Sequence, residues 1–226
     1  MSIRSFSHTF RKAFITKFFR LQYSQFGEDA VIRELVSRKR DGFYVDVGCY
    51  HPKRFSNSYW LYLKGWRGIN IDMEAHKIAM FKLARPGDVN IVAAISNEKE
   101  KLRIHRAREN DLEARLVKPG DRGETSELIE TTTLNDVLDS TKFRRRPIDV
   151  LSVDTEGYDL KVVQSLDWDI YKPALVILET HEEDIYSVLH SEINLFMESV
   201  GYVLRSWTVK SLIYVRRVGL ASGSPR

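Results

Sequence analysis

The sequence predicts an α/β fold in which helices cover both faces of a mostly parallel sheet. Short apolar segments typical of buried strands alternate along the chain with segments of helical period, which favours parallel strands joined by helices. Two adjacent strand-like segments, 202–209 and 211–217, predict a closing antiparallel hairpin. The 226 residues are enough for one substantial core, and no repeat or second domain is visible.

The first half of the chain divides at turn and cap signals. Strands are predicted at 43–47, 68–72 and 90–96, and helices at 56–65 and 74–84. Ser24 is a candidate cap for an earlier helix, and Gly65 is a helix-ending glycine. Residues 101–107 alternate like an exposed additional strand, and the polar stretch 107–130 is predicted as a long loop.

The second half continues the alternation. Thr133 caps a short predicted helix, and strands are predicted at 148–154 and 174–180. A helix between them places Leu160, Val163 and Leu166 on one face. A single long helix over 185–200 follows from apolar residues at helical spacing. We assign 23–218 to the folded domain and 219–226 to a flexible tail.

Composition narrows the class of protein. The chain is 43% hydrophobic and 29% charged, which is typical of a globular protein. No stretch approaches the roughly 20 apolar residues that a membrane-spanning helix needs. The single cysteine, Cys49, excludes an intramolecular disulfide framework and a multi-cysteine zinc site. We expect a cytoplasmic location, because the amino end lacks the continuous apolar region of a signal peptide.

Positive charge is concentrated at the amino end. The net charge is +4, and residues 1–27 contain five basic residues and no acid. The remainder is near neutral, which argues against a nucleic-acid partner. Phenylalanines that recur every four residues predict a basic amphipathic helix over 1–22: Phe6, Phe10, Phe14 and Phe18. That helix would dock on the protein's own core or a second subunit, or alternatively on an anionic membrane surface.

Acidic residues lie at the ends of the first two predicted strands. Asp46 and Gly48 end the first strand, and Asp72 closes the second, where an acid accepts hydrogen bonds from ribose hydroxyls. A dinucleotide fingerprint needs three glycines, but only Gly48 is present, which disfavours a pyrophosphate cofactor and a nicotinamide-dependent oxidoreductase. The pattern favours S-adenosylmethionine, with Asp46 facing its ammonium group.

Five separated motifs resemble, in order, the FkbM family of S-adenosylmethionine-dependent methyltransferases. They are YSQFGEDAVI, GFYVDVGCYHPKRFSNSYWLYLKGWRGINID, TLNDVLD, IDVLSVDTEGYDLKVVQSLDW and PALVILET. The resemblance implies a class I methyltransferase fold, a Rossmann-like three-layer sandwich whose seven-stranded, mostly parallel sheet has an antiparallel terminal strand. It also implies methyl transfer to hydroxyl oxygens of sugars, glycolipids or polyketides. Residues 97–130 match the family poorly and would set acceptor specificity.

The expected cofactor-binding residues lie at the predicted strand ends and in the segment before the first helix of the domain. They are Gln25, Glu28, Asp46, Gly48, Asn57, Asp72, Met73, Ala94 and Asp154. Some of them carry a second interpretation. Asn57 is also a candidate helix cap, and Gln25 and Glu28 either close over the methionine end of the cofactor or only cap a helix.

Methyl transfer to a hydroxyl requires alignment of the reacting atoms and removal of the hydroxyl proton. Candidate bases in three loops at the carboxyl edge are His51, Asp154, Glu156 and His181. Each is alternatively a helix cap or a solvated loop residue. Asp154, Glu156 and His181 would alternatively bind Mg²⁺ or Mn²⁺ and orient the acceptor oxygens.

The leading hypothesis is an S-adenosylmethionine-dependent O-methyltransferase acting on a saccharide, a glycolipid or another small molecule. A nucleic-acid methyltransferase is one alternative and predicts a broad basic surface with exposed aromatic residues. A non-catalytic module that binds an adenosyl ligand is the other.

Overall fold

The computed structural model describes residues 21–106, 114–117 and 126–217. Its main sheet has seven strands in the order β3-β2-β1-β8-β9-β11-β10. These strands are β1 Phe43–Val47, β2 Arg67–Asp72, β3 Val89–Val92, β8 Val150–Val153, β9 Leu175–Glu179, β10 Tyr202–Thr208 and β11 Ser211–Arg216. β11 runs antiparallel to both of its neighbours, and the other neighbouring pairs run parallel. The predicted class I methyltransferase sheet is confirmed.

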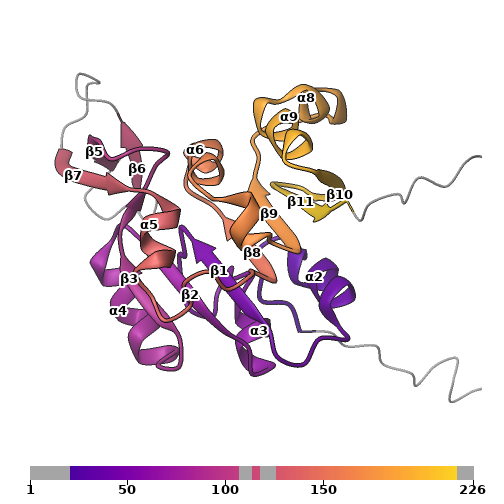
Figure 1. The fold of residues 1–226 in the computed structure, drawn as a ribbon, viewed down its shortest axis with the longest axis horizontal. Coiled ribbons are helices and arrows are strands. Elements are labelled where there is room, and N and C mark those ends of the chain that lie inside the picture. The colour runs from indigo at the N-terminus through magenta and orange to yellow at the C-terminus, as the bar shows by residue number, and fades with distance from the viewer. Residues whose placement is uncertain (1–20, 107–113, 118–125, 218–226) are drawn as a thin grey trace, which may run out of the picture.

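Helices form a layer on each side of this sheet (Figure 1). One layer consists of α2 Glu28–Val36, α3 Tyr59–Leu63 and α4 Ala75–Ala84. The other consists of α5 Leu134–Asp139, α6 Asp159–Gln164, α7 Trp168–Tyr171, α8 Ile185–His190 and α9 Glu192–Ser199. The predicted three-layer arrangement is therefore present. None of the described helices has the length and apolar character that crossing a membrane requires.

Alternation along β1 divides its side chains between the two layers. Val45 and Val47 pack in the larger apolar cluster, together with residues of α5, α6, α8 and α9. Tyr44 packs in the smaller cluster with Ile32 of α2 and Leu61 of α3. Because successive residues of a strand point to opposite faces, Asp46 lies on the same side as Tyr44. This orientation decides what Asp46 can contact.

A second sheet corrects the prediction of a long loop over 107–130. It contains β4 Ala94–Ile95, β5 Lys101–Arg106, β6 Ala114–Val117 and β7 Ser126–Thr132, in the order β4-β7-β5-β6. Apolar residues of three strands, Ala94, Leu102, Ile104 and Leu116, form a buried cluster there. The strand predicted at 101–107 is present, but its apolar side chains are buried. Burial of this cluster away from water stabilises the second sheet, although most of the segment is polar.

Two further predicted elements are interrupted. The strand expected at 90–96 divides at Ala93 into β3, which belongs to the main sheet, and β4, which belongs to the second. The helix expected over 185–200 divides at Ser191, whose backbone is extended. The Ser191 hydroxyl accepts a hydrogen bond from Asn194 N at 3.3 Å and so caps α9. The apolar residues on the two sides of Ser191 therefore keep helical spacing, although the helix itself is interrupted there.

The helix starts differ from two of the predicted caps. α2 begins at Glu28 after Gly27, so Ser24 is not its cap residue, although the Ser24 hydroxyl accepts from Asp29 N at 3.1 Å. α3 begins at Tyr59, and the Ser56 hydroxyl, not Asn57, accepts from its backbone amide at 3.1 Å. The predicted Thr133 cap is confirmed. Most of the predicted helix 1–22 and the tail 219–226 lie outside the described residues.

Candidate active site

A cavity of about 330 Å³ lies at the carboxyl edge of the main sheet. Its walls come from the ends of β1, β2 and β8, from the β3–β4 junction and from β6 of the second sheet. The predicted site residues that line it are Gln25, Gly48, Asp72, Met73, Ala94, Asp154 and Glu156. The other predicted site residues, Glu28, Asp46, His51, Asn57 and His181, are not part of its lining.

Gly48 brings the end of β1 against the end of β8. Its φ angle is +78°, and its amide donates to Ile71 O at 2.8 Å. A Cβ atom at this position would lie 1.6 Å from the carbonyl oxygen of Asp154. Both the backbone conformation and the close approach therefore require glycine.

Asp72 places a carboxylate on the opposite wall. Its Oδ1 accepts from Glu74 N at 2.7 Å, and its Oδ2 lies 3.5 Å from Lys77 Nζ. Lys77 also lies 3.1 Å from Glu74 Oε2 and lines the cavity. Burial raises the pKa of Asp72 to about 6, although the charge of Lys77 opposes that rise. The carboxylate is therefore ionised at neutral pH and is available to accept hydrogen bonds from a ligand.

Asp46 lies behind the cavity in a buried polar network. It accepts a hydrogen bond from the Ser58 hydroxyl, and burial raises its pKa. Ser58 accepts in turn from Arg85 Nη1 at 2.8 Å, and the Arg85 side chain is fully buried. Asp46 thus supports the loop after β1, and its predicted contact with the cofactor stays a prediction.

Arg85 is a residue that the sequence analysis missed. Its guanidinium donates to Pro52 O, to the Ser56 hydroxyl at 2.9 Å and to Ser58, so one side chain fixes both ends of the loop 52–58. The sequence places it only at the end of a helix before Pro86, and nothing there signals a buried cation.

Glu28 and Asn57 make contacts within the protein. Glu28 accepts from Phe26 N at 2.9 Å and from the Ser211 hydroxyl at 3.0 Å, which fastens the segment before α2 to β11. Asn57 Nδ2 donates to the Ser152 hydroxyl at 3.1 Å. The contacts predicted between these two side chains and the cofactor stay predictions.

His51 shapes the loop after β1. Its Nδ1 accepts from the amides of Lys53 and Arg54, each at 3.0 Å. Burial, followed by the charge of Arg54, lowers the pKa of His51. The loop presents Arg54 and Phe55 to the cavity, and Phe55 has a φ angle of +54°. A role for His51 as a base stays a prediction.

Asp154 and Glu179 form a carboxyl pair at the ends of adjacent strands. The register of β8 and β9 sets Val153 opposite Leu178 and so brings the next residues side by side. Burial and neighbouring carboxylates raise the pKa of Asp154 to about 7 and that of Glu179 to about 9. Near neutral pH the two carboxyl groups are therefore not both ionised, and the pair retains a proton.

Asp159 makes hydrogen bonds to the backbone next to both members of this pair. It accepts from the Thr155 amide at 3.3 Å and hydroxyl at 3.1 Å, and from Glu179 N at 3.3 Å. Burial raises its pKa to about 6. Asp159 and Glu179 were not among the predicted site residues, although the strand register would have indicated Glu179.

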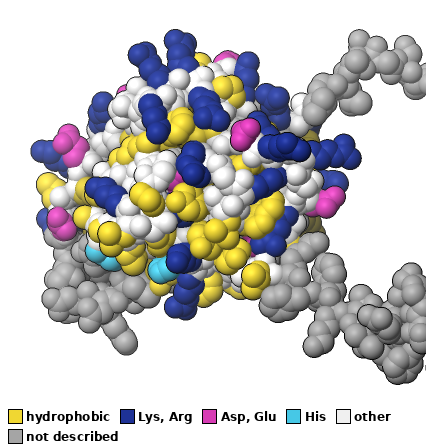
Figure 2. All heavy atoms as spheres, turned by 90° about the horizontal axis from the view of Figure 1, so that it is seen from below, with side chains coloured by type: hydrophobic (Ala, Val, Ile, Leu, Met, Phe, Trp, Pro, Cys, Tyr) yellow, Lys and Arg dark blue, Asp and Glu magenta, His cyan; other side chains and the backbone are white. Residues whose placement is uncertain are grey.

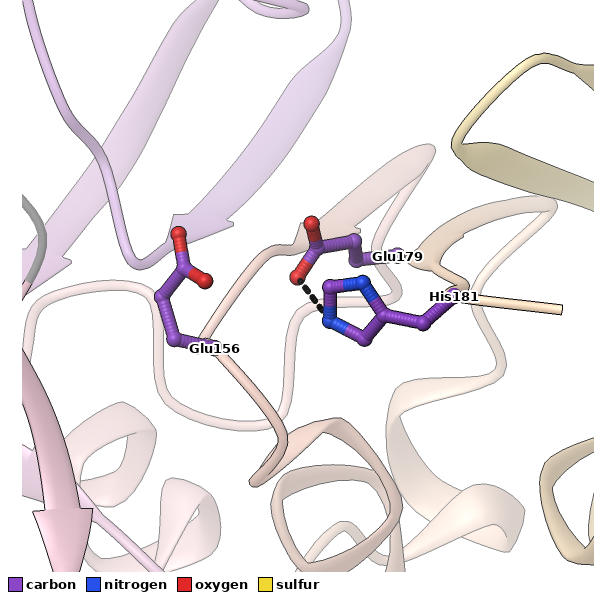
Figure 3. Close-up of side chains that lie close together, drawn as sticks. All are labelled: Glu156, Glu179 and His181. Atoms are coloured by element: carbon purple, nitrogen blue, oxygen red, sulfur yellow. Dashed lines mark ion pairs between the residues drawn. The ribbon is translucent and has the colours of Figure 1, made fainter.

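Glu156, Glu179 and His181 form a second group at the same edge (Figure 3). One ligand atom of each lies within 4.8 Å of those of the others. His181 Nε2 is 3.5 Å from Glu179 Oε2, a buried oxygen that accepts no hydrogen bond from the described residues. Glu179, not Asp154, therefore completes the group with the predicted residues Glu156 and His181.

The cavity lining fits S-adenosylmethionine. Asp72 offers acceptors to ribose hydroxyls, and Met73 and Ala94 offer apolar surface to an adenine ring. Only Gly48 is present where a pyrophosphate cradle would need several glycines. The donor set therefore suits an adenosyl ligand without phosphates.

Two solved structures resemble the chain. A TehB-like S-adenosylmethionine-dependent methyltransferase from Corynebacterium glutamicum has 13% identity and a TM-score of 0.42, over 95% of this chain and 97% of that one. A putative type 11 methyltransferase from Sulfolobus solfataricus has 11% identity and a TM-score of 0.41, over 89% of this chain and 98% of that one. A comparison with curated proteins gave no match.

The family match covers most of the site. The family model described as "Methyltransferase FkbM domain" matches residues 46–204. This span begins at Asp46 and includes Asp72, Asp154 and Glu179, and the family assignment agrees with the observed strand order and with the residues that line the cavity. The chain therefore belongs to the FkbM family of S-adenosylmethionine-dependent methyltransferases.

Proposed function

We propose that this methyltransferase acts on oxygen and methylates a hydroxyl of a saccharide, a glycolipid or another small molecule. The observation that carries the proposal is the Asp154–Glu179 carboxyl pair, with Asp154 lining the cavity. A hydroxyl must lose its proton as it is methylated, and a base with a pKa near the working pH is the most effective. Desolvation in the cavity wall and the neighbouring carboxylates of Asp159 and Glu156 raise the pKa of Asp154 to about 7, and its side chain remains accessible from the cavity.

The residues divide the work as follows. Asp72, Met73 and Ala94 would hold the adenosyl part of the cofactor. When bound, S-adenosylmethionine supplies a methyl group that the acceptor oxygen takes up as its own proton leaves. Asp154 would accept that proton and release it to solvent. Glu179, whose pKa is raised further, would keep its proton, so that Asp154 is the member of the pair that ionises first and can accept the proton.

The test uses purified protein, a labelled methyl donor, and panels of glycans, lipid extracts and oligonucleotides. We expect transfer to a hydroxyl compound, with kcat lower by about 10²–10⁴-fold in Asp154→Asn. Binding of S-adenosylhomocysteine should remain within a few-fold of the parent protein. The matched control is Glu183→Gln, an exposed acid in the loop after β9 that should change neither quantity.

Other outcomes would identify a different function. Full activity of Asp154→Asn would remove the proposed base. Transfer only to oligonucleotides would favour a nucleic-acid methyltransferase. Ligand binding without transfer to any panel would favour the non-catalytic module.

The group in Figure 3 favours a second mechanism for the same reaction. A divalent cation held by Glu156, Glu179 and His181 would orient acceptor oxygens and lower the pKa of a bound hydroxyl. Two carboxylates and an imidazole with completing waters suit Mn²⁺, whereas a site dominated by oxygen suits Mg²⁺. Loss of activity in EDTA, restored by one of these ions, would support the cation mechanism.

A further inference from the structure

The two helical layers carry opposite surface charge. Residues 21–87, which supply α2, α3 and α4, have seven exposed basic side chains, Arg38, Lys39, Arg40, Lys53, Arg54, Arg67 and Lys82, and two exposed acidic ones, Glu34 and Asp41. Residues 133–201, which supply α5 to α9, have eight exposed acidic side chains besides the cavity residue Asp154, and five exposed basic ones. Such a separation of charge orients a protein in front of an anionic surface.

The basic layer also exposes large apolar side chains. Figure 2 views the molecule from the side of α2, α3 and α4, and shows dark blue Lys and Arg among yellow apolar side chains, with few magenta acids. We call this outer surface the α2–α4 face. Its most exposed apolar side chains include Leu63 and Leu83, with 53% and 86% of their surface accessible.

The combination of charge and aliphatic side chains selects the partner. Basic residues interspersed with exposed leucines are typical of protein surfaces that lie at a membrane interface. Single-stranded nucleic acid is instead held by aromatic platforms. On this face the rings of Trp60 and Tyr62 are half-buried, and Arg33 and Arg67 lie over them at 5.1 and 5.2 Å from the ring centroids.

The described chain begins on the same side of the molecule. Arg33 Nη2 of α2 donates to Leu21 O at 2.7 Å, so the chain enters the described fold beside α2. The residues before Leu21 carry five basic side chains and no acid. Their charge is therefore tethered to the face that is already basic.

We propose that the α2–α4 face docks on an anionic lipid surface. Most of the side chains that define this face lie at the ends of α2, α3 and α4 that lead into the next strands, whereas the cavity lies at the carboxyl edge of the sheet. The docking itself does not depend on which acceptor is methylated.

The experiment is flotation of the full chain with vesicles of phosphatidylcholine alone and of phosphatidylcholine mixed with phosphatidylglycerol. We expect binding to the anionic vesicles only, weakening as salt is raised. The variant Arg38→Gln/Arg40→Gln/Lys82→Gln should lower partitioning by about fivefold for each charge removed. Leu63→Gln and Leu83→Gln should lower it further by removing apolar contacts.

Matched controls are taken from surfaces outside this face. Lys142→Gln/Lys172→Gln/Lys210→Gln removes the same number of exposed charges, and Leu195→Gln matches Leu63, with 54% of its surface accessible. The controls should bind vesicles as the parent does, and thermal melting confirms that each variant is folded.

Three outcomes would overturn the proposal. One is equal loss of binding in the control variants. Another is parent-like binding by the variants of the α2–α4 face while Arg11→Gln/Lys12→Gln abolishes binding. The third is the absence of vesicle binding together with tight binding of a single-stranded oligonucleotide. Because flotation requires no turnover, failure of docking and failure of methyl transfer are read separately.

Discussion

The carbonyl oxygen of Asp154 lies where a side chain on Gly48 would begin, 1.6 Å from an added Cβ atom. This contact joins the ends of β1 and β8 and leaves room for nothing larger than hydrogen. It locks together the two strand ends that carry the glycine turn and the proposed base.

Gly48→Ala should therefore damage both stability and cofactor binding. The overlap is with backbone, so β8 must shift, and the φ angle of +78° adds about 1 kcal/mol of strain. The control is Gly65→Ala, with a φ angle of +94° and no atom within 4 Å of the added Cβ. Urea unfolding should show a loss clearly larger than that of the control, and calorimetry should show weaker S-adenosylhomocysteine binding. Equal losses would contradict the contact.

Cofactor affinity should depend on the charge of Asp72. Burial raises the pKa of this carboxyl to about 6, so its protonated fraction grows as pH falls through 6. The carboxylate accepts hydrogen bonds from ribose hydroxyls more strongly than the neutral acid does, and affinity should fall in the same interval. Asp72→Asn should bind more weakly and lose this part of the pH dependence. Calorimetric titration of both proteins between about pH 5 and 8 checks it, and parallel profiles would contradict it.

The raised pKa of Asp72 has the opposite effect on the stability of the fold. Because the pKa is higher in the folded protein than in the unfolded chain, the ionised Asp72 costs stability above pH 6. Protonation relieves that cost as pH falls, so binding and stability should respond to Asp72 in opposite directions. Denaturant unfolding of the parent and Asp72→Asn in the same buffers would show it.

Replacing Arg85 should unfold the loop after β1. Arg85→Met leaves Pro52 O and the Ser56 and Ser58 hydroxyls without their buried donor, at a cost of about 3–5 kcal/mol. Arg85→Lys should recover little, since one ammonium cannot reach all three acceptors. Lys82→Met, an exposed position three residues earlier, is the control and should be near neutral. A small effect of Arg85→Met in urea unfolding would show that the network is dispensable.

Glu179→Gln separates the two mechanisms. If Glu179 already holds the proton of the pair, an amide there still donates to Asp154, and kcat should change by less than about tenfold. If Glu179 ligates a cation, the same variant should lose metal-dependent activity. His181→Asn serves as the parallel test, because His181 belongs only to the cation group. Steady-state kinetics with EDTA and with added Mn²⁺ gives the result.

The main sheet was predictable because its strands are short apolar runs that end at an acid or a glycine. β1, β2, β8 and β9 all show this pattern, and period-two alternation would also have directed Asp46 to the side of Tyr44. The second sheet was not, because β6 and β7 lie in a polar segment and are held by only a few buried side chains, Leu116 among them. The break at Ser191 was hidden by apolar spacing that continues across it.

Asp72 and Asp154 could be predicted as site residues because each lies at the end of a predicted strand. Site residues that depend on pairing between distant segments could not be predicted in this way. Glu179 requires the register of β8 with β9, and Arg85 requires the loop 52–58 to fold over it. No local pattern encodes either relationship.

The second sheet joins β3 through the single residue Ala93 and returns directly to α5 through Thr133. Its first point of attachment, Ala93, lines the cavity, and neither point lies in the strands that carry Gly48 and Asp154. A graft of residues 96–132 from a relative would exchange the part of this wall that contains Leu116, while Ala94, Gly48 and Asp154 stayed in place. We expect such an exchange to alter the choice of acceptor and to leave the proposed adenosyl contacts of Asp72, Met73 and Ala94 in place.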